Sequence, residues 1–233
     1  MDLSPFLQAV TKGNLDEVKR LHNQGASLEE SLKNGSTALI LAAENNRLEI
    51  VKYLLEAGAD PAATTKMGGT ALNRAAENGN IQIMKYLLEK GVPVGDLALI
   101  VAAREGNQEA VQLLTEAEAD VNARQRWGQT AIMLAAREGH TEIVRYLIEH
   151  GSNVKLRDKN GDTALNIALD NDNADIAIML KKAGAKAQIK KVKAPIVAED
   201  EDDEDTEEVD SSVDDMDDII SDDDELPDNV DLD

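Results

Sequence analysis

The residues best suited to catalysis are few and far apart in this sequence. The only histidines are His22, His140 and His150, in a chain of 233 residues that has no cysteine. Without cysteine there is no thiol nucleophile, no thiolate zinc site and no disulfide. No spacing pairs two carboxylates for acid–base work, and no glycine-rich phosphate loop follows an expected strand. We therefore expect a protein that is not an enzyme and that has no catalytic residues, no metal ligands and no cofactor.

The chemistry that the chain does offer is charge, concentrated at one end. Residues 199–233 contain 21 acids and no base, whereas residues 1–198 contain 25 acids and 24 bases. The formal net charge of −22 therefore belongs almost wholly to the C-terminal segment. A segment so charged and so poor in aromatic residues cannot bury a core, which predicts a disordered acidic tail. Its charge also repels phosphates, so we expect no direct binding of nucleic acid.

Apolar residues interrupt the acidic tail at helical spacing. Val209, Val213, Met216 and Ile219 follow one another at intervals of 4, 3 and 3 residues, and Ile220 adjoins the last. Such a pattern within an acidic segment favours folding on a basic partner, which would relieve the self-repulsion. The alternative is a solubilising tail with incidental apolar residues.

The rest of the chain is built from a repeat. The triplets that begin at Thr37 and Thr70 are 33 residues apart, and so are those that begin at Thr130 and Thr163. The steps between successive anchors are 33, 33, 27, 33 and 33 residues, the anchors being Pro5, Ala38, Ala71, Ala98, Ala131 and Ala164. A regular period of this length is typical of stacked repeat units.

Each unit predicts two short helices. A threonine or serine precedes the first helix as its cap, and a pair of alanines such as Ala42-Ala43 lets two helices approach closely. A glycine or asparagine then breaks the chain, and apolar pairs one turn apart mark a second helix. Tyr53, Tyr86 and Tyr146 share one position of this second helix, which favours core packing over nucleic-acid contacts.

This pattern resembles the ankyrin repeat, whose signature is T-P-L-H-x-A. Here the signature begins as Ser4-Pro5-Phe6-Leu7 and continues as T-A-L/I-x-x-A, with the histidine replaced in every unit. The resemblance implies an all-α solenoid of six helix-turn-helix units with β-turn fingers over residues 1–190. A linker, residues 191–198, would join it to the disordered acidic tail, residues 199–233.

The fourth unit lacks most of its finger. Six residues are missing between Gly91 and Ala98, by comparison with the stretch from Gly58 to Ala71. We expect the remaining residues 92–96 only to turn the chain, with Asp96 capping the next helix. In the same unit Glu118 stands where other units close the second helix with a glycine, so we expect a strained left-handed residue there.

The resemblance also implies which residues meet a partner, because ankyrin proteins bind with their finger tips and first helices. The expected partner-binding residues are Lys33, Asn34, Glu44, Lys66, Met67, Glu77, Arg104, Arg126, Trp127, Arg137 and Lys159. The only tryptophan, Trp127, falls at a finger tip, where we expect an exposed binding hot spot; the alternative is a ring packed flat on the next finger. Arginines around it suit an acidic or polar peptide.

These features predict a non-enzymatic adaptor that binds another protein through its concave surface, assisted by Val213, Met216, Ile219 and Ile220 of the tail. The alternatives are a chaperone or escort of a basic client, such as a histone or ribosomal protein, and an inhibitor that mimics nucleic acid. We find no secretory signal and no membrane span in the sequence. We therefore expect a cytoplasmic protein, or a nuclear one in a eukaryote, that is a monomer or part of a hetero-complex.

Overall fold

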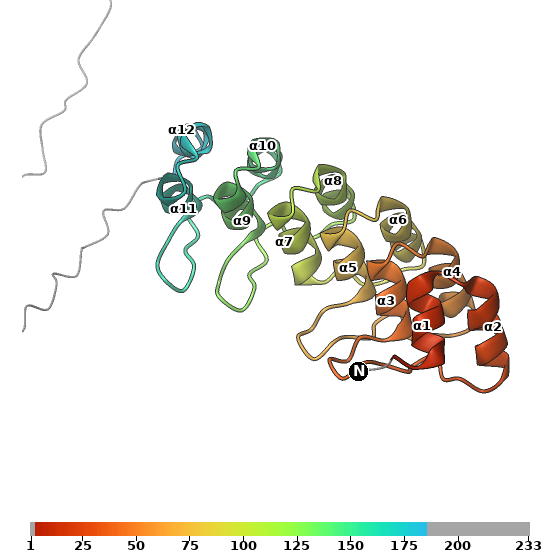
Figure 1. The fold of residues 1–233 in the computed structure, drawn as a ribbon. Coiled ribbons are helices and arrows are strands. Elements are labelled where there is room, and N and C mark those ends of the chain that lie inside the picture. Colours follow the sequence, from red (N-terminus) through yellow and green to blue (C-terminus); the bar gives the residue numbers. More distant parts are fainter. Residues whose placement is uncertain (1–2, 186–233) are drawn as a thin grey trace, which may run out of the picture. The chain divides into compact units, whose positions relative to one another are not determined.

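A computed structural model describes residues 3–185, which lie within one compact unit. Within them, six pairs of antiparallel helices are stacked side by side (Figure 1). The first helices of the pairs are α1 (Pro5–Lys12), α3 (Ala38–Glu44), α5 (Ala71–Glu77), α7 (Asp96–Arg104), α9 (Ala131–Glu138) and α11 (Ala164–Asp170). The second helices are α2 (Leu15–Asn23), α4 (Leu48–Glu56), α6 (Ile81–Glu89), α8 (Gln108–Glu116), α10 (Thr141–Glu149) and α12 (Ala174–Lys182). The described residues form no strand, so the expected all-α solenoid is confirmed.

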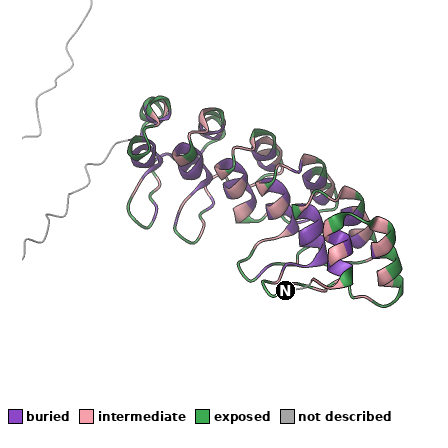
Figure 2. Cartoon of the chain, in the orientation of Figure 1, coloured by how far each residue is buried: buried purple, intermediate pink, exposed green. Residues whose placement is uncertain are grey.

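The first helices form the inner layer of the stack and pack on one another more extensively than the second helices do. Small side chains make this possible, because Ala42, Ala43, Ala75 and Ala76 are all fully buried. The second helices bury one apolar face and expose the other face to solvent, as Figure 2 shows by colour. The positions of the alanine pairs in the sequence therefore determine that the first helices form the more closely packed layer.

Side-chain caps fix where most first helices begin. The hydroxyls of Thr37, Thr70 and Thr163 each accept a hydrogen bond from an amide three residues later. The expected cap of α7 is wrong: Gly95 is the capping residue, and Asp96 is the first residue of the helix. Because Gly95 is extended, with ψ at 159°, the chain enters the helix one residue before the carboxylate could act as the cap. The carboxylate of Asp96 instead lies in the first turn of α7, where the helix dipole stabilises its negative charge.

The strained residue expected in the fourth unit is present. Glu118 has a φ of 61°, in the left-handed region that glycine occupies in the other units. A side chain in this conformation costs roughly 1–2 kcal/mol.

Neighbouring units are joined by side chains that reach back from the start of each second helix. The side-chain amides of Asn80, Asn107 and Asn173 each donate a hydrogen bond to a backbone carbonyl at the end of the first helix of the preceding unit, at 2.8–2.9 Å. His140 occupies the same repeat position, and its Nε2 lies 2.9 Å from the carbonyl oxygen of Arg104. These bonds satisfy helix-end carbonyls that have no partner within their own helix.

The side chain of Asn73 carries one of the buried polar atoms of the inner layer that lack a partner, and this predicts a stabilising substitution. Asn73 is 6% exposed and its Oδ1 accepts no hydrogen bond within residues 3–185, while the equivalent residue of the fifth unit is Met133. We expect Asn73→Met to raise the free energy of unfolding by about 1–2 kcal/mol, because a buried unpaired acceptor is removed. Denaturant unfolding of both proteins measures the change.

The matched control for this substitution is Asn166→Met, in the last unit. Asn166 shares the repeat position and burial of Asn73, but its Oδ1 accepts a hydrogen bond from Thr163 at 2.9 Å. That variant loses a bond and should gain little or no stability. Equal gains at both positions would show that the unpaired oxygen is not the cause.

Candidate functional site

Four β-turn fingers project from the stack, before α3, α5, α9 and α11 (Figure 1). Each finger closes with the same backbone hydrogen bond, from an amide at the start of the tip to a carbonyl four residues later. These bonds measure 2.8–3.0 Å, and they join Leu32 to Ser36, Thr65 to Gly69, Gln125 to Gln129 and Asp158 to Asp162. The four tips therefore have a common geometry, and residues at equal repeat positions are structurally equivalent.

Every tip begins with an exposed base. The bases are Lys33, Lys66, Arg126 and Lys159. The residue that follows each base is also exposed, namely Asn34, Met67, Trp127 and Asn160. The structure thus brings together in one row seven of the residues that the sequence places at the binding surface. We call these eight residues the tip row.

Backbone hydrogen bonds join neighbouring tips in pairs. The amide of Lys66 donates to the carbonyl of Asn34 at 2.9 Å, and the amide of Lys159 donates to the carbonyl of Trp127 at 3.0 Å. The tips of the first pair and those of the second pair are therefore held in register without using their side chains.

Trp127 does not pack flat into the stack. Its side chain is 62% exposed, and the guanidinium carbon of Arg126 lies 5.8 Å from the centroid of its ring. Met67 is 79% exposed at the equivalent position of the second finger. These are large apolar surfaces offered to solvent at the ends of turns, although their role in binding a partner stays a prediction.

The first helices add an ion network that the sequence analysis did not foresee. Glu77 of α5 forms ion pairs with Arg74 at 2.6 Å and with Arg104 of α7 at 2.8 Å. Arg104 forms a second ion pair with Glu105 at 2.7 Å. The hydrogen bond to Glu105, with the charges of Glu105 and Glu77, raises the pKa of Arg104. The charge of Arg104 is therefore balanced by two carboxylates, and its role in binding a partner stays a prediction.

Arg74 is the member of this network that sequence reasoning missed. It stands at a position of the first helix where the first unit carries Gln8 and the other four carry Leu41, Val101, Leu134 and Ile167. The only charged residue at a mostly apolar position was the available signal. Its Nε is buried without a partner among the described residues, and the guanidinium is held through Nη1, which donates to Glu77.

The two remaining predicted residues on the first helices take no part in this ion network. Glu44 at the end of α3 is exposed, and Arg137 near the end of α9 is half-buried. Within residues 3–185, the side chain of neither residue forms an ion pair. Among the predicted partner-binding residues, the bases that form no ion pair within residues 3–185 are therefore those of the tip row and Arg137.

The histidines serve local contacts instead of one site. Nδ1 of His22 lies 2.6 Å from the hydroxyl of Tyr53, and the ring of His150 stacks on Tyr146 at 3.8 Å between centroids. Tyr53, Tyr86 and Tyr146 are half-buried against the core. In the described part of the chain, no group of three acidic or histidine residues is arranged to hold a metal ion.

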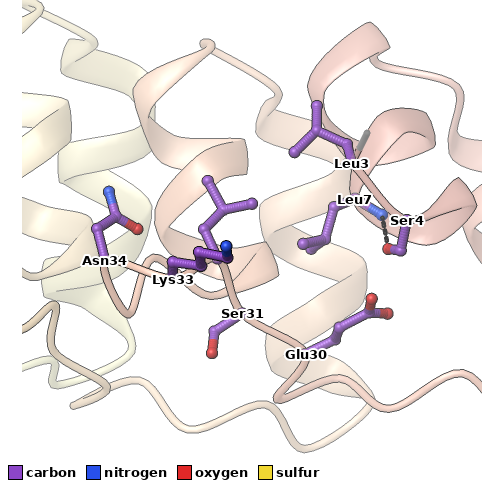
Figure 3. Close-up of a pocket in the computed structure, with 8 residues that line it drawn as sticks. Leu3, Ser4, Leu7, Glu30, Ser31, Lys33 and Asn34 are labelled. Carbon is purple, nitrogen blue, oxygen red and sulfur yellow. Dashed lines mark hydrogen bonds between the residues drawn. The ribbon is translucent and has the colours of Figure 1, made fainter. Parts of the chain in front are cut away.

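A hollow of about 690 Å³ lies at the N-terminal end of the stack (Figure 3). Leu3 and Leu7 line it from the first unit, and Leu32 and Lys33 line it from the first finger. The sequence carried one signal for it, because the residue equivalent to Leu32 is Thr65, Gln125 or Asp158 in the other fingers. An apolar residue at the base of a finger tip indicates a surface that is covered or hollowed.

Several predicted features lie outside the described residues. They are the linker, residues 191–198, and the tail with Val213, Met216, Ile219 and Ile220. Within residues 3–185, none of the helices combines the length and the hydropathy of a membrane span.

Comparisons with known proteins agree with this architecture. A family model described as ankyrin repeats (three copies) matches residues 6–98, 60–125 and 99–191. One similar chain belongs to a solved complex of the predatory endopeptidase Bd0816 from Bdellovibrio bacteriovorus with the immunity protein Bd3460. It is 29% identical to this chain, with a TM-score of 0.69, and the match covers 78% of this chain and 99% of that one. The human ASB11 ankyrin repeat domain is 25% identical, with a TM-score of 0.70, over 79% of this chain and 85% of that one. Among curated proteins, no sequence matches.

Proposed function

The chain belongs to the ankyrin-repeat family, and on that premise we propose that it binds a partner protein through the tip row and the adjoining first helices. The observation that carries this proposal is the tip row itself. Four exposed bases stand at one repeat position, and Met67 and Trp127 expose large apolar side chains beside two of them. Tryptophan and arginine are both enriched in binding hot spots.

The charge of the tip row indicates the chemistry of the partner. Exposed lysine and arginine side chains favour a partner surface rich in carboxylates. The apolar residues of the row add contact area that does not depend on charge. The preferred partner is therefore a folded protein that presents an acidic surface with an apolar centre.

The solved complex supports a role in which binding restrains the partner. Its components are an endopeptidase and an immunity protein, and this chain is similar to one chain of that structure over 99% of that chain's length. We propose by analogy that the present protein is an adaptor or inhibitor that has no chemistry of its own. The identity of the partner does not carry over.

A second candidate function is the escort of a basic client. It is favoured by the 21 acidic residues of the tail, whose carboxylates would shield a client's positive charge or mimic the phosphates of nucleic acid. The tip row argues against the same client occupying the repeats, because both surfaces would then be cationic.

Charge reversal of the tip row tests the proposed function. The variant Lys33→Glu, Lys66→Glu, Arg126→Glu and Lys159→Glu should weaken binding of the partner about tenfold, chiefly through slower association, because electrostatic steering is inverted. The measurement is affinity purification from cells of the source organism, followed by binding kinetics with the captured protein.

The control carries the same change of charge elsewhere. Lys12, Lys19, Lys90 and Lys182 are exposed and lie on or beside helices away from the tips, so reversing all four should leave partner binding unchanged. If both variants lose the partner equally, net charge rather than the tip row controls binding. If deleting residues 199–233 removes the partners and reversing the tips does not, the escort function replaces the one proposed.

A further inference from the structure

The row of fingers is interrupted at its centre. Only residues 92–95 connect the end of the third unit to α7, and Figure 1 shows loops before α5 and α9 but none before α7. The tip of Met67 and the tip of Trp127 are thus the two that border the break. We call this interruption the finger gap.

The backbone groups on both sides of the finger gap match those that join neighbouring fingers elsewhere. In the intact pairs, the amide of the base donates to the carbonyl of the residue 32 positions earlier, as Lys66 does to Asn34. By the same register, a finger in the gap would donate to the carbonyl of Met67 and accept from the amide of Arg126. Neither group forms a backbone hydrogen bond within residues 3–185. A donor on one side and an acceptor on the other are therefore left for an incoming turn.

The side chains beside the gap differ from those at the outer ends of the row. Met67 and Trp127 are 79% and 62% exposed and are the two most exposed large apolar residues of the described chain. At the same position, the two outer tips carry Asn34 and Asn160. Among the finger tips, large apolar side chains therefore face solvent only at the two that border the missing finger, and tryptophan is enriched in binding hot spots.

The charges beside the gap select its occupant. Lys66 and Arg126 stand on its two sides at the repeat position that is basic in every finger. A basic residue inserted between them would be repelled from both sides, whereas an acidic residue would interact favourably with both. The shortened connection, residues 92–95, has no charged residue. Asp96, which follows it, lies in the first turn of α7, where the helix dipole stabilises its charge.

We propose that the finger gap is the seat of a β-turn loop of the partner protein, which completes the row of fingers. The loop carries a carboxylate at the repeat position that Lys66 and Arg126 have in their own fingers. A large apolar residue follows the carboxylate and contacts Met67 and Trp127. Its backbone pairs with the carbonyl of Met67 and the amide of Arg126. This inference rests on the proposed function and specifies the part of the partner that is recognised.

A peptide copy of the chain's own finger is a direct probe. The probe is residues 59–70 with Lys66→Glu, closed into a ring through a cysteine added at each end; the comparison peptide keeps Lys66. Trp127 is the only tryptophan, so its fluorescence in the full chain reports binding at the gap. We expect the acidic ring to shift this emission and to bind about tenfold more tightly than the basic ring, because its carboxylate lies between two cations.

Filling the gap gives the matched control. Replacing residues 92–97 by a copy of residues 59–70 restores the spacing of 13 positions found between Gly58 and Ala71. The filled chain should keep its helical circular dichroism and fail to bind the acidic ring. If the filled chain does not fold, Met67→Asn takes its place: it copies the outer tips, leaves Trp127 as reporter, and should weaken the acidic ring several-fold.

The outcomes separate this inference from the proposed function. No shift of Trp127 emission at saturating peptide, or equal binding of both rings, overturns the assignment of the gap. A filled chain that still captures the partner while charge reversal of the tips abolishes capture overturns the gap but keeps the proposed function. A shift of Trp127 emission on adding salt alone would indicate that the chain's own acidic segment occupies the gap, and it would overturn the choice of a partner loop.

Discussion

Replacing Trp127 with alanine is expected to weaken binding of the partner protein by about 2 kcal/mol or more, about 30-fold in affinity. The ring is 62% exposed in the unbound chain, so a partner that covers it removes a large apolar surface from water. Calorimetric titration of the wild-type and variant chains with the captured partner measures the loss. The melting temperature should not change, because the ring contributes little to the core.

The control for Trp127 is an apolar residue of similar exposure elsewhere. Ile178 of α12 is 52% exposed and lies on a second helix, away from the tips. Ile178→Ala should bind the partner as the wild-type chain does. A Trp127→Ala chain that melts earlier and binds as before would contradict both the exposure of the ring and its role.

Replacing Gly106 with alanine is expected to lower the free energy of unfolding by about 3 kcal/mol. Two effects combine. Gly106 has a φ of 78°, in the left-handed region, and a Cβ there would lie 2.6 Å from Cε1 of His140. The imidazole would have to move, and its hydrogen bond to the Arg104 carbonyl, which joins the fourth unit to the fifth, would be lost. Denaturant unfolding monitored by circular dichroism measures the change.

Gly91 separates these two effects. It has a similar φ of 73°, but nothing lies within 4 Å of the position of a Cβ. Gly91→Ala should therefore cost only the conformational strain, roughly 1–2 kcal/mol. Adding His140→Ala to Gly106→Ala should be less damaging than the sum of the two single changes, because the clash is already relieved. Equal losses at Gly91 and Gly106 would show that the contact with His140 has no energetic weight.

The sequence by itself determined the architecture. The period of 33 residues, the alanine pairs and the apolar pairs of the second helices all act within one unit, over contacts that are local in the chain. The same is true of the chain reversals, where Glu118 could be assigned a left-handed conformation from its place in the repeat. Local rules also located the finger tips, because the tip is defined by its distance from the first helix.

The sequence did not determine how neighbouring units use their side chains. Arg104 and Glu77 are 27 residues apart and belong to different units, so their ion pair depends on the rotation of one unit against the next and on two rotamers. For that reason the sequence placed Arg104 among the partner-binding residues without showing that it pairs with Glu77 and Glu105. Arg74, in contrast, could have been found from sequence, since it is the only charged residue at a repeat position that is apolar in four of the six units.

The tertiary structure alone decided what surrounds the shortened fourth unit. Counting residues showed that a finger is missing, but it did not show that Gly95 rather than Asp96 caps α7. It also did not show that, within residues 3–185, the amide of Arg126 and the carbonyl of Met67 lack the partners that equivalent groups have in the intact pairs. Backbone pairing between fingers depends on the stacking of whole units. The sequence of one unit fixes its own helices, whereas only the stacked chain determines which groups at its edges are left free.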